Sequence, residues 1–549
     1  MFRNFLIVGL RSLWRNKVYT ALNVLGLTLG IATALVVFLL LREDLSYNKN
    51  IPNDDEVYRV IKEYMYSQGP EYFPDTSYPL ADAMRADLPD VFVTQIHYHG
   101  SGIIKIAEKK VEVSEGVIFT DSVITDVLGL EWIAGDAKTA FSEPNKAVLT
   151  RELAETWYGS IEEAMGQTFM LDGISTLVVT GVIENWPQNT NMPIQVAVSI
   201  SSLQPFADNL GSGNLESWTW SWSSSVWIRK NEVLPNEYLD PVFDRITNEH
   251  LDEKGASLTR YFLQPLAEVH FDQTYEEDTR GIVTSRSLIA VMMSIGVLIL
   301  LIACINFINL ATAQSLKRAH EVGVRKVLGG RKNHLTWQFL TETLIVTVFA
   351  TVLALALVEI SLTKMLEELQ LNISLQYDLG LFIFLAIIIL FTTFAAGAYP
   401  AFVLAGFKPV AALQSVLLNR KKGNTVSLRR GLVIFQFAVS QVLIATTLVF
   451  AAQVNFFQDK ELGFRKDMVL VTGLPESDSA KIAQIRQDLS RYPETSNVAF
   501  ASGPPTSNNI FNVDAWLPEQ KETTTLTAEL KIVDTSYKRL YGLEMAAGR

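Results

Sequence analysis

The feature that most constrains this chain is an uncharged apolar run, Ser287 to Leu316, followed at once by a basic segment. A run of this length exceeds the roughly 20 residues that a helix needs to cross a bilayer. Residues 317–335 then carry six Lys or Arg residues against a single acid, Glu321. Basic loops resist translocation and remain on the cytosolic side. The pair therefore predicts a helix that enters the membrane from outside and presents a short cationic element inside.

Apolar runs of similar kind recur along the chain, and hydrophobic residues make up 49% of it. We predict a membrane protein with an α-helical transmembrane bundle and five spans, at 18–41, 287–316, 336–363, 379–404 and 431–458. Residues 1–17 contain four Lys or Arg and no acid, and the linker 405–430 contains six and none, whereas residues 42–286 hold 39 Asp or Glu against 18 Lys or Arg. This partition predicts a cytoplasmic N-terminus and an acidic domain outside the bacterial inner membrane.

The acidic domain, residues 42–286, mixes strand and helix patterns. Alternating or β-branched runs predict strands at 57–64, 102–107, 110–114, 175–183 and 194–200, and helical periodicity appears at 80–88, 151–158 and 236–254. The expected class is α+β. Cys304 is the only cysteine, so no intramolecular disulfide can form.

Several local patterns carry two interpretations. Residues 1–17 alternate apolar residues with arginines, which predicts an interfacial amphipathic helix; a plain extension of the first span is the alternative. Gly26 and Gly30 form a small-xxx-small pattern that permits close helix packing.

The WTWSW stretch at 218–222 could form a platform for a carbohydrate or lipid ligand, but clustered aromatic residues are more often part of a core or an interface. His97 and His99 alternate on a strand without the further ligands of a metal site, and we predict no metal, cofactor or catalytic residue. Glu342 and Glu359 lie near the ends of the third span, where we expect both to snorkel.

The sequence also contains an internal repeat. A shift of 413 residues lays the first span onto the fifth, and lays 119–136 onto 532–549 with identities that include Asp121/Asp534 and Gly129/Gly542. Residues 459–549 are therefore expected to begin a second, incomplete extracytoplasmic domain. The expectation is that the sequence is a C-terminally truncated piece of a two-unit protein.

Three segments resemble the MacB/FtsX-like ABC transporter permease family, in its duplicated Bacteroidetes-type variant. They are RSLWRNKVYTALNVLGLTLGIA (11–32), the segment 147–199, and NFINLATAQSLKRAHEVGVRKVLGGRKNHLTWQFLTETL (306–344). The last is similar to the family pattern R-x-x-E-I-G-I-R-K-A-x-G-A followed by Q-F-L-x-E, with Gly330 where alanine is usual. The resemblance implies a MacB-like periplasmic core domain and a coupling helix that contacts a separate ATPase. Its expected coupling residues are Arg318, Glu321, Val322, Gly323, Val324, Arg325, Lys326 and Gly329.

The physical interpretation agrees, because a cationic helix with apolar Val322, Val324, Val327 and Leu328 can dock by burying that face. A helix lying on anionic membrane lipid is the alternative. The chain has no G-x-x-x-x-G-K-[ST] phosphate loop, so we expect no ATPase activity here and a cytosolic ABC ATPase subunit as partner. The other expected partners are a second permease copy or the missing half of this chain, and a periplasmic adaptor or outer-membrane channel; nucleic acid is not expected.

The predicted function is transmission of ATP-driven conformational change to the periplasmic domain for export, efflux or lipoprotein release. The alternative is a mechanotransmitter that controls a cell-wall hydrolase or a sensor partner without transport. A membrane-anchored extracytoplasmic enzyme is disfavoured, because the acidic domain shows no serine elbow, metal-ligand set or carboxylate pair. A sensor kinase or chemoreceptor is disfavoured because no cytosolic output domain is present.

Overall fold

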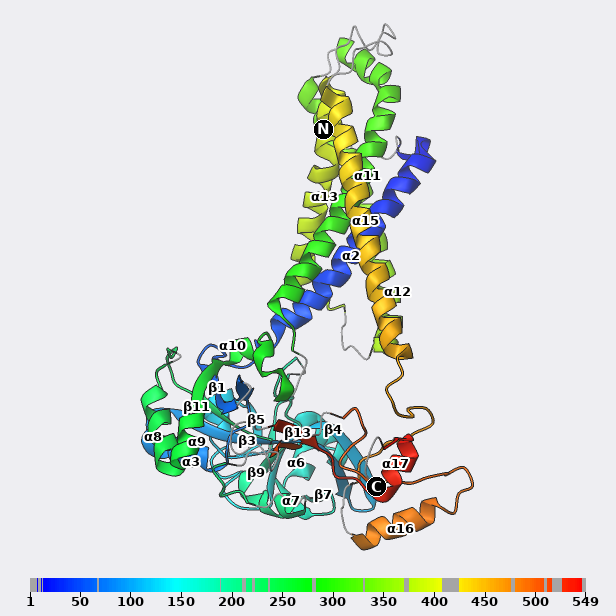
Figure 1. The fold of residues 1–549 in the computed structure, drawn as a ribbon. Helices are drawn as coiled ribbons and strands as arrows, with labels where there is room; N and C mark the ends of the chain where they lie inside the picture. The colour runs from blue at the N-terminus through cyan, green and yellow to red at the C-terminus, as the bar shows by residue number, and fades with distance from the viewer. Residues whose placement is uncertain are drawn as a thin grey trace. The chain divides into compact units, whose positions relative to one another are not determined.

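The structure, a computed structural model, divides into two compact units that are described separately (Figure 1). One unit comprises Met1–Leu45 and Arg286–Asp459, and the other comprises Ser46–Ser285 and Lys460–Arg549. The residues described are 7, 11, 13–66, 69–187, 189–209, 214–219, 223–235, 237–278, 283–328, 331–369, 375–406, 424–474, 479–507, 511–515 and 526–545. Most of the predicted amphipathic helix at 1–17, residues 407–423 of the predicted linker 405–430, and residues 220–222 lie outside them, while residues 424–430 of that linker are helical.

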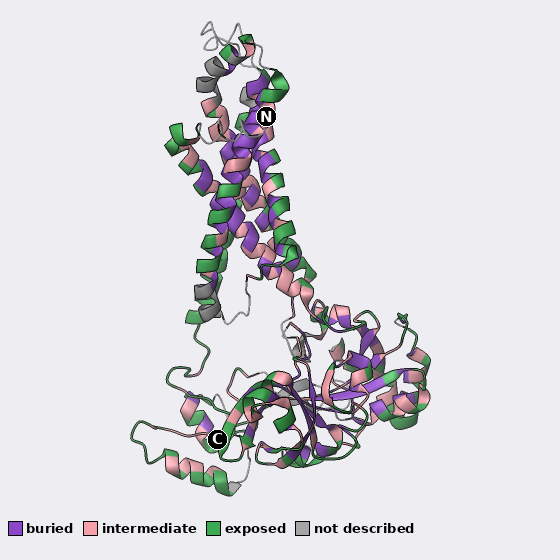
Figure 2. Ribbon diagram, turned by 180° about the vertical axis from the view of Figure 1, so that it is seen from behind, coloured by how far each residue is buried: buried purple, intermediate pink, exposed green. Residues whose placement is uncertain are grey.

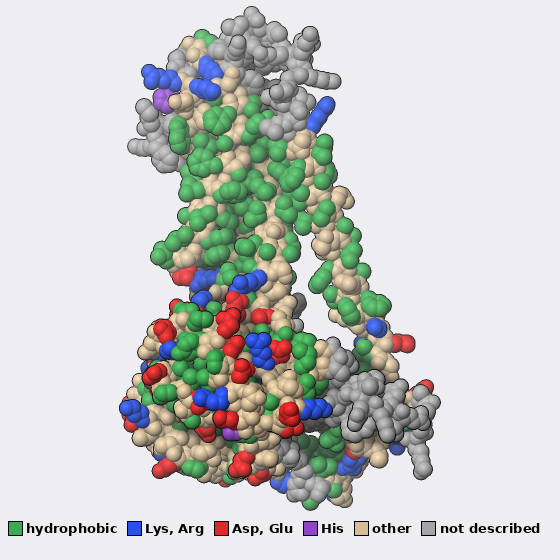
Figure 3. All heavy atoms as spheres, turned by 60° about the vertical axis from the view of Figure 1, so that its left-hand side comes forward, with side chains coloured by type: hydrophobic (Ala, Val, Ile, Leu, Met, Phe, Trp, Pro, Cys, Tyr) green, Lys and Arg blue, Asp and Glu red, His purple; other side chains and the backbone are tan. Residues whose placement is uncertain are grey.

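The first unit consists of long apolar helices. Among the described residues, five helices are long and apolar enough to cross a membrane, which confirms the predicted class. Hydrophobic side chains cover most of the sides of this unit in Figure 3, and Lys and Arg side chains gather near its ends. The helices are α2 (Lys17–Ser46), α11 (Arg286–Val327), α12 (Lys332–Leu369), α13 (Leu379–Gly406) and α15 (Asn424–Asp459).

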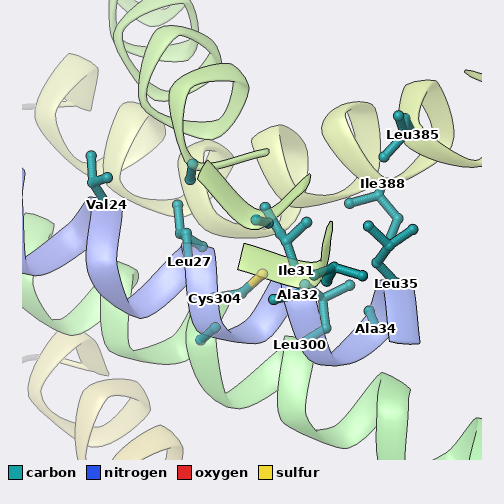
Figure 4. Close-up of a cluster of buried hydrophobic side chains, with 14 of the residues drawn as sticks. Val24, Leu27, Ile31, Ala32, Ala34, Leu35, Leu300, Cys304, Leu385 and Ile388 are labelled. Atoms are coloured by element: carbon teal, nitrogen blue, oxygen red, sulfur yellow. The ribbon is translucent and has the colours of Figure 1, made fainter. Parts of the chain in front are cut away.

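The core of the bundle is built by α2, α11, α12 and α13. Leu27, Ile31 and Leu35 are at most 1% exposed and form one face of α2. They pack with Leu300 and Cys304 of α11 and with apolar residues of α12 and α13 in a single cluster (Figure 4). By contrast, the most apolar part of α15 has no buried residue. Four of the five helices therefore share one interior.

An ion pair joins the ends of α2 and α13. The two terminal guanidinium nitrogens of Arg42, Nη1 and Nη2, donate to the Asp378 carboxylate at 3.1 and 2.7 Å. The Leu381 N–H also donates to Asp378 at 3.0 Å, as an N-cap contact does. That backbone donor, followed by Arg42, holds the pKa of Asp378 below its ordinary value. The start of α13 is thereby tied to the end of α2.

The acidic domain is built on a mixed 11-stranded sheet with the order β11-β1-β10-β3-β4-β9-β6-β8-β5, in which β2 pairs with β1, and β7 pairs with β3 and β8. The pairs β4–β9 and β6–β8 are parallel, and the other pairs are antiparallel. The strands are β1 (Val57–Tyr66), β2 (Gly69–Phe73), β3 (Phe92–Ile106), β4 (Lys109–Thr120), β5 (Trp132–Gly135), β6 (Lys146–Thr150), β7 (Thr168–Leu171), β8 (Ser175–Ile183), β9 (Val196–Ser199), β10 (Ser224–Arg229) and β11 (Thr259–Pro265).

Helices cover this sheet, and much of its length is coloured as buried in Figure 2. Helices α3 and α8 pack on strands β1, β3, β10 and β11, while α5, α6 and α7 pack on β4 and β6–β9. This arrangement confirms the α+β class. The helices are α3 (Pro79–Asp87), α4 (Ile124–Leu128), α5 (Arg151–Tyr158), α6 (Ile161–Ala164), α7 (Gln204–Asn209), α8 (Asp240–His250), α9 (Glu253–Leu258) and α10 (Leu266–Val269), with 3-10 turns η1 (Ile200–Ser202) and η2 (Gln273–Asp278).

Element predictions succeeded where periodicity was strong. Strand β8 and helix α5 have the predicted bounds, while β3 and β4 extend well beyond the predicted strands. The single helix expected at 236–254 is wrong. Leu251 turns to extended backbone after α8, and Asp252 then accepts a hydrogen bond from the Gly255 N–H as the N-cap of α9.

Residues 460–545 contain α16 (Ser479–Leu489), β12 (Phe511–Ala515), β13 (Leu526–Leu530) and α17 (Thr535–Tyr541). Asp534 caps α17, pairs with Arg486 and accepts from the Phe500 N–H at 2.9 Å. In the acidic domain Asp121 likewise pairs with Arg85 and accepts from the Gln95 N–H at 3.1 Å. Both following helices end at a left-handed glycine, Gly129 and Gly542. The two aspartates that the self-comparison aligns thus have the same local surroundings.

Candidate coupling site at the basic end of the bundle

Helix α11 carries the second span directly into the basic segment. It is one helix of 42 residues, about 63 Å long at 1.5 Å per residue. The boundary expected at residue 316 is therefore not a helix end, because no proline or glycine interrupts the helical hydrogen bonds there. A displacement of the basic segment must be shared by the apolar part of the same helix.

One face of this basic segment is buried inside the protein. Val322 is 2% exposed and packs with Leu335 and Phe339 of α12, and with Ala401 and Leu404 of α13. Gly323 is buried as well. The basic segment is thereby fixed to the ends of two other spans.

Lys326 strengthens this attachment. Its Nζ donates a hydrogen bond to the Ala405 carbonyl at 2.7 Å, in the last turn of α13. A cation there satisfies a terminal carbonyl and complements the negative end of the helix dipole. Partial burial, and then the charge of Lys332, lower the pKa of the Lys326 ammonium below its ordinary value. Lys326 therefore acts within the chain, as a cap on α13.

We expect Lys326→Met to lower the stability of the bundle by about 1 kcal/mol, because the α13 terminus loses its charged donor. The exposed neighbour Lys332 provides the matched control, and Lys332→Met should leave stability unchanged or slightly raised, because the Lys332 charge repels the Lys326 ammonium. Thermal unfolding of the purified protein in detergent measures both. Equal effects of the two substitutions would show that the cap contributes nothing.

The opposite face of the segment is apolar and exposed. Val324, Val327 and Leu328 are 38%, 62% and 80% exposed. At 100° per residue all three lie roughly opposite Val322. The predicted docking face of four apolar residues is therefore wrong for Val322, which is packed in the core. Val324, Val327 and Leu328 remain available for contact with a partner protein. Arg331 and Lys332 are exposed close by in the chain and add positive charge.

The other predicted coupling residues are only partly visible. Arg318, Glu321 and Arg325 lie on α11, but their side chains are outside the described part of the structure. Gly329 is outside it altogether.

A buried carboxylate lies in the interior near this end of the bundle. Glu342 is 7% exposed, accepts from Gln338 Nε2 at 3.3 Å, and lines a cavity of about 40 Å³ together with Tyr19 and Gly397. The expectation that Glu342 snorkels is therefore wrong, because its helix face points at the neighbouring helices. Glu359 does lie near the surface, where it accepts from the Tyr377 hydroxyl at 3.1 Å.

Gly26 and Gly30 lie where α2 approaches α11. A Cβ placed on Gly30 would come within 2.7 Å of the Ala303 Cβ, and one on Gly26 within 3.4 Å of Asn306 Nδ2. A similar approach occurs between Gly397 of α13 and Thr343 of α12. Such backbone proximity is how transmembrane helices gain packing contacts.

We expect Gly30→Ala to destabilise the bundle by roughly 1–3 kcal/mol, because α2 and α11 must separate to admit the methyl group. Gly431 lies on α15, where a Cβ would have no neighbouring atom within 4 Å. Gly431→Ala should be neutral or slightly stabilising through helix propensity. Thermal unfolding in detergent compares them, and a loss of the same size at both glycines would contradict the packing role.

The chain that leaves α2 is held by asparagines. Asn48 is 2% exposed at φ +61°, and its Nδ2 donates to Asn191 Oδ1 at 2.9 Å. Asn48 Oδ1 accepts from the Thr190 hydroxyl and the Asn191 N–H, at 2.9 and 3.1 Å. Asn189 Nδ2 donates to Ser46 Oγ at 2.7 Å. Sequence reasoning missed this junction, although the asparagines of SYNKN and QNTN were a possible signal.

The histidines considered as metal ligands are occupied otherwise. His97 is buried with Nδ1 2.7 Å from the Tyr78 hydroxyl, and His99 Nε2 lies 2.6 Å from Asp172. Within the described residues, no group of three or more His, Cys, Asp or Glu side chains could hold a metal ion. Trp218 stacks on His250 with ring centroids 4.0 Å apart.

Comparison with known proteins agrees with this architecture. The MacB-like periplasmic core domain matches residues 20–231, and the FtsX-like permease C-terminal domain matches residues 293–409. The macrolide export ATP-binding/permease protein MacB of Pasteurella multocida (strain Pm70) is 22% identical over 275 residues, 49% of this chain and 37% of that protein. MacB 1 of Yersinia pestis bv. Antiqua (strain Antiqua) is 22% identical over 362 residues, 65% of this chain and 52% of that protein.

The chain therefore spans about half the length of these relatives or less. Among solved structures, the periplasmic region of MacB from Actinobacillus actinomycetemcomitans is 13% identical, with a TM-score of 0.28, covering 41% of this chain and 95% of that chain. The first match covers the first span and most of the acidic domain, and the second match covers most of the second, third and fourth spans. The chain belongs to the MacB/FtsX-like family of ABC transporter permeases.

Proposed function

We propose that this permease transmits the movement of a separate cytosolic ABC ATPase to the acidic domain, which would lie in the periplasm, and so drives export or lipoprotein release. The observation that carries the proposal is the two-faced basic segment of α11. Its exposed face, Val324, Val327 and Leu328, offers an apolar contact flanked by cations. On its buried face, Val322 packs against α12 and α13, and Lys326 donates a hydrogen bond to the end of α13.

The route through the membrane is rigid. Helix α11 is continuous, and α2 and α11 approach closely at Gly30. Packed, low-compressibility interiors pass on displacement as rigid-body or shear motion. Both helices lead by chain connection into the acidic domain, and the asparagine junction at Asn48 receives the end of α2. The filled interior of the bundle favours movement of helices over passage of cargo between them.

Co-purification tests the ATPase partnership. Wild-type permease expressed in its native host should retain a protein with the G-x-x-x-x-G-K-[ST] motif, identified by mass spectrometry. Gly323→Pro should lose it, because proline breaks α11 between its two contacts at a cost of about 3 kcal/mol or more. Gly431→Ala serves as a folded control. Retention of the ATPase by Gly323→Pro would refute the proposed coupling segment.

Transport and signalling without transport give different results in proteoliposomes. Stimulation of ATPase activity by a candidate cargo supports transport, whereas a hydrolase or sensor bound to the acidic domain supports the mechanotransmitter alternative.

The orientation of the chain in the membrane is tested separately, in intact cells, with Cys304 replaced by serine. A membrane-impermeant maleimide should label Lys109→Cys, in the acidic domain, and spare Leu328→Cys. Labelling of Leu328→Cys would overturn the proposed topology.

A further inference from the structure

A small cavity of about 40 Å³ lies within the acidic domain, between one face of the sheet and the segment Asn191–Ile194. Its apolar lining includes Ile96, Ile118 and Trp227, from strands β3, β4 and β10, which are at most 5% exposed. One water needs roughly 10–15 Å³ of such space, so the cavity accepts a group of about three heavy atoms. That is the size of a carboxylate.

A buried arginine forms one wall of the cavity. Arg59 is 5% exposed, and its guanidinium lies over the Trp227 ring with its centre 5.7 Å from the ring centroid. Its Nε and Nη2 both donate to Gln264 Oε1, at 3.1 and 2.7 Å. The strand register places Gln264 and Trp227 on either side of Arg59. The guanidinium, which has five N–H donors in a planar fork, is thus held in a fixed plane at the cavity.

A second donor enters the cavity from the covering segment. Asn191 is 6% exposed, and its Oδ1 is already used by Asn48. Its Nδ2 is buried without a hydrogen-bond partner in the structure, although buried amides are nearly always paired. This amide therefore lacks an acceptor at the place where the cavity offers room for one.

The third polar residue that lines the cavity, Asp75, carries a negative charge. Asp75 is only partly buried and accepts from the Ser223 N–H at 2.7 Å. The acidic domain as a whole is strongly negative, so its long-range field does not attract anions. An anion bound here would therefore be held by the Asn191 amide and by the short-range positive charge of Arg59.

We propose that this cavity binds a carboxylate no larger than formate or acetate. The carboxylate oxygens would accept from Asn191 Nδ2 and face the Arg59 guanidinium, while the carbon end of the ligand would lie on the Ile96 and Trp227 side. Charge-assisted hydrogen bonds of this kind are the strong ones. Binding at this site does not depend on the proposed transport function.

Isothermal titration calorimetry of the full chain in detergent tests the proposal, with acetate as the probe and acetamide as its neutral counterpart. Acetate should bind with a dissociation constant on the order of 1 mM, and acetamide at least tenfold more weakly. The absence of acetate binding up to tens of millimolar, or equal binding of the amide, would overturn it. A peptide ending in glycine, compared with its C-terminal amide, shows whether the carboxylate can belong to a chain terminus; a free carboxylate is the source if only acetate binds.

Two substitutions with opposite signs localise the binding. Asn191→Asp keeps the oxygen that Asn48 needs, removes the donor and adds a negative charge, so acetate binding should weaken at least tenfold. Asp75→Asn keeps the contact with Ser223 and removes a repulsive charge, so binding should tighten several-fold. Asn231→Asp, on an exposed residue that accepts from Arg229, is the matched control and should change nothing. Weakening by Asn231→Asp to the same extent, or no tightening in Asp75→Asn, would place the binding elsewhere.

Discussion

Leu328→Asp is expected to abolish retention of the ATPase while leaving the permease folded. The side chain is 80% exposed, so a charge there meets water in the free protein. In a docked complex the same charge would be buried against the partner, without a counter-ion to pair with it. Central apolar anchors of interfaces commonly contribute 2 kcal/mol or more, which corresponds to a loss of affinity of at least about thirtyfold.

Val322→Asp, less than two helical turns from Leu328, should have the opposite effect: it should unfold the permease. Val322 is 2% exposed among side chains of α12 and α13, so an aspartate there is buried without a partner in the permease itself. We expect a loss of several kcal/mol in stability, and a loss of ATPase retention only as a consequence of unfolding.

Thermal unfolding and ATPase co-purification should be measured on the same preparations. Val233 is 65% exposed in the acidic domain, and Val233→Asp controls for adding a charge at an exposed apolar residue. Normal ATPase retention by Leu328→Asp would show that the exposed apolar face is not the contact. Unchanged stability of Val322→Asp would mean that the basic segment is not attached to α12 and α13.

The spans and the α+β class could be predicted because each rests on a property of contiguous residues. Long uncharged runs specify membrane helices whatever their neighbours are. Strand β8 and helix α5 were found because their periodicity is locally complete. The division of 236–254 at Asp252 was missed because a helical pattern continues across a cap that only the backbone reveals.

The site was less accessible to sequence reasoning, because its geometry depends on pairs of helices. The motif identified the basic segment, but nothing in its letters distinguishes Val322 from Val324 as core and surface. That distinction arises when α12 and α13 occupy one side of α11. The burial of Glu342 has the same origin, since a position near a span end suggests snorkelling until neighbouring helices are placed around it.

Asn48→Ala should lower the stability of the acidic domain strongly. The substitution should release the chain that follows α2 from the loop of residues 189–191 that holds it. The substitution removes the donor to Asn191 Oδ1 and leaves two buried groups, the Thr190 hydroxyl and the Asn191 N–H, without their acceptor. Buried polar groups that lose their partners cost about 1–3 kcal/mol each, so for the two groups we expect a total of roughly 2–6 kcal/mol.

Backbone strain must be separated from this loss, because Asn48 has a left-handed conformation at φ +61° and alanine tolerates it less well. Asn53 provides the control, since it is exposed and has a similar φ of +55°. Asn53→Ala therefore carries the strain without the buried network, and the difference between the two variants measures the network alone.

Hydrogen–deuterium exchange with mass spectrometry gives the readout that a merely local strain would not produce. In Asn48→Ala, amides of residues 189–194 should exchange faster, because the Asn191 N–H has lost its acceptor, while strands β6 and β8 should keep their protection. Asn53→Ala should leave residues 189–194 unchanged. If exchange at 189–194 is the same in both variants, the end of α2 is not held by this loop, and force from the membrane must enter the acidic domain through α11 instead.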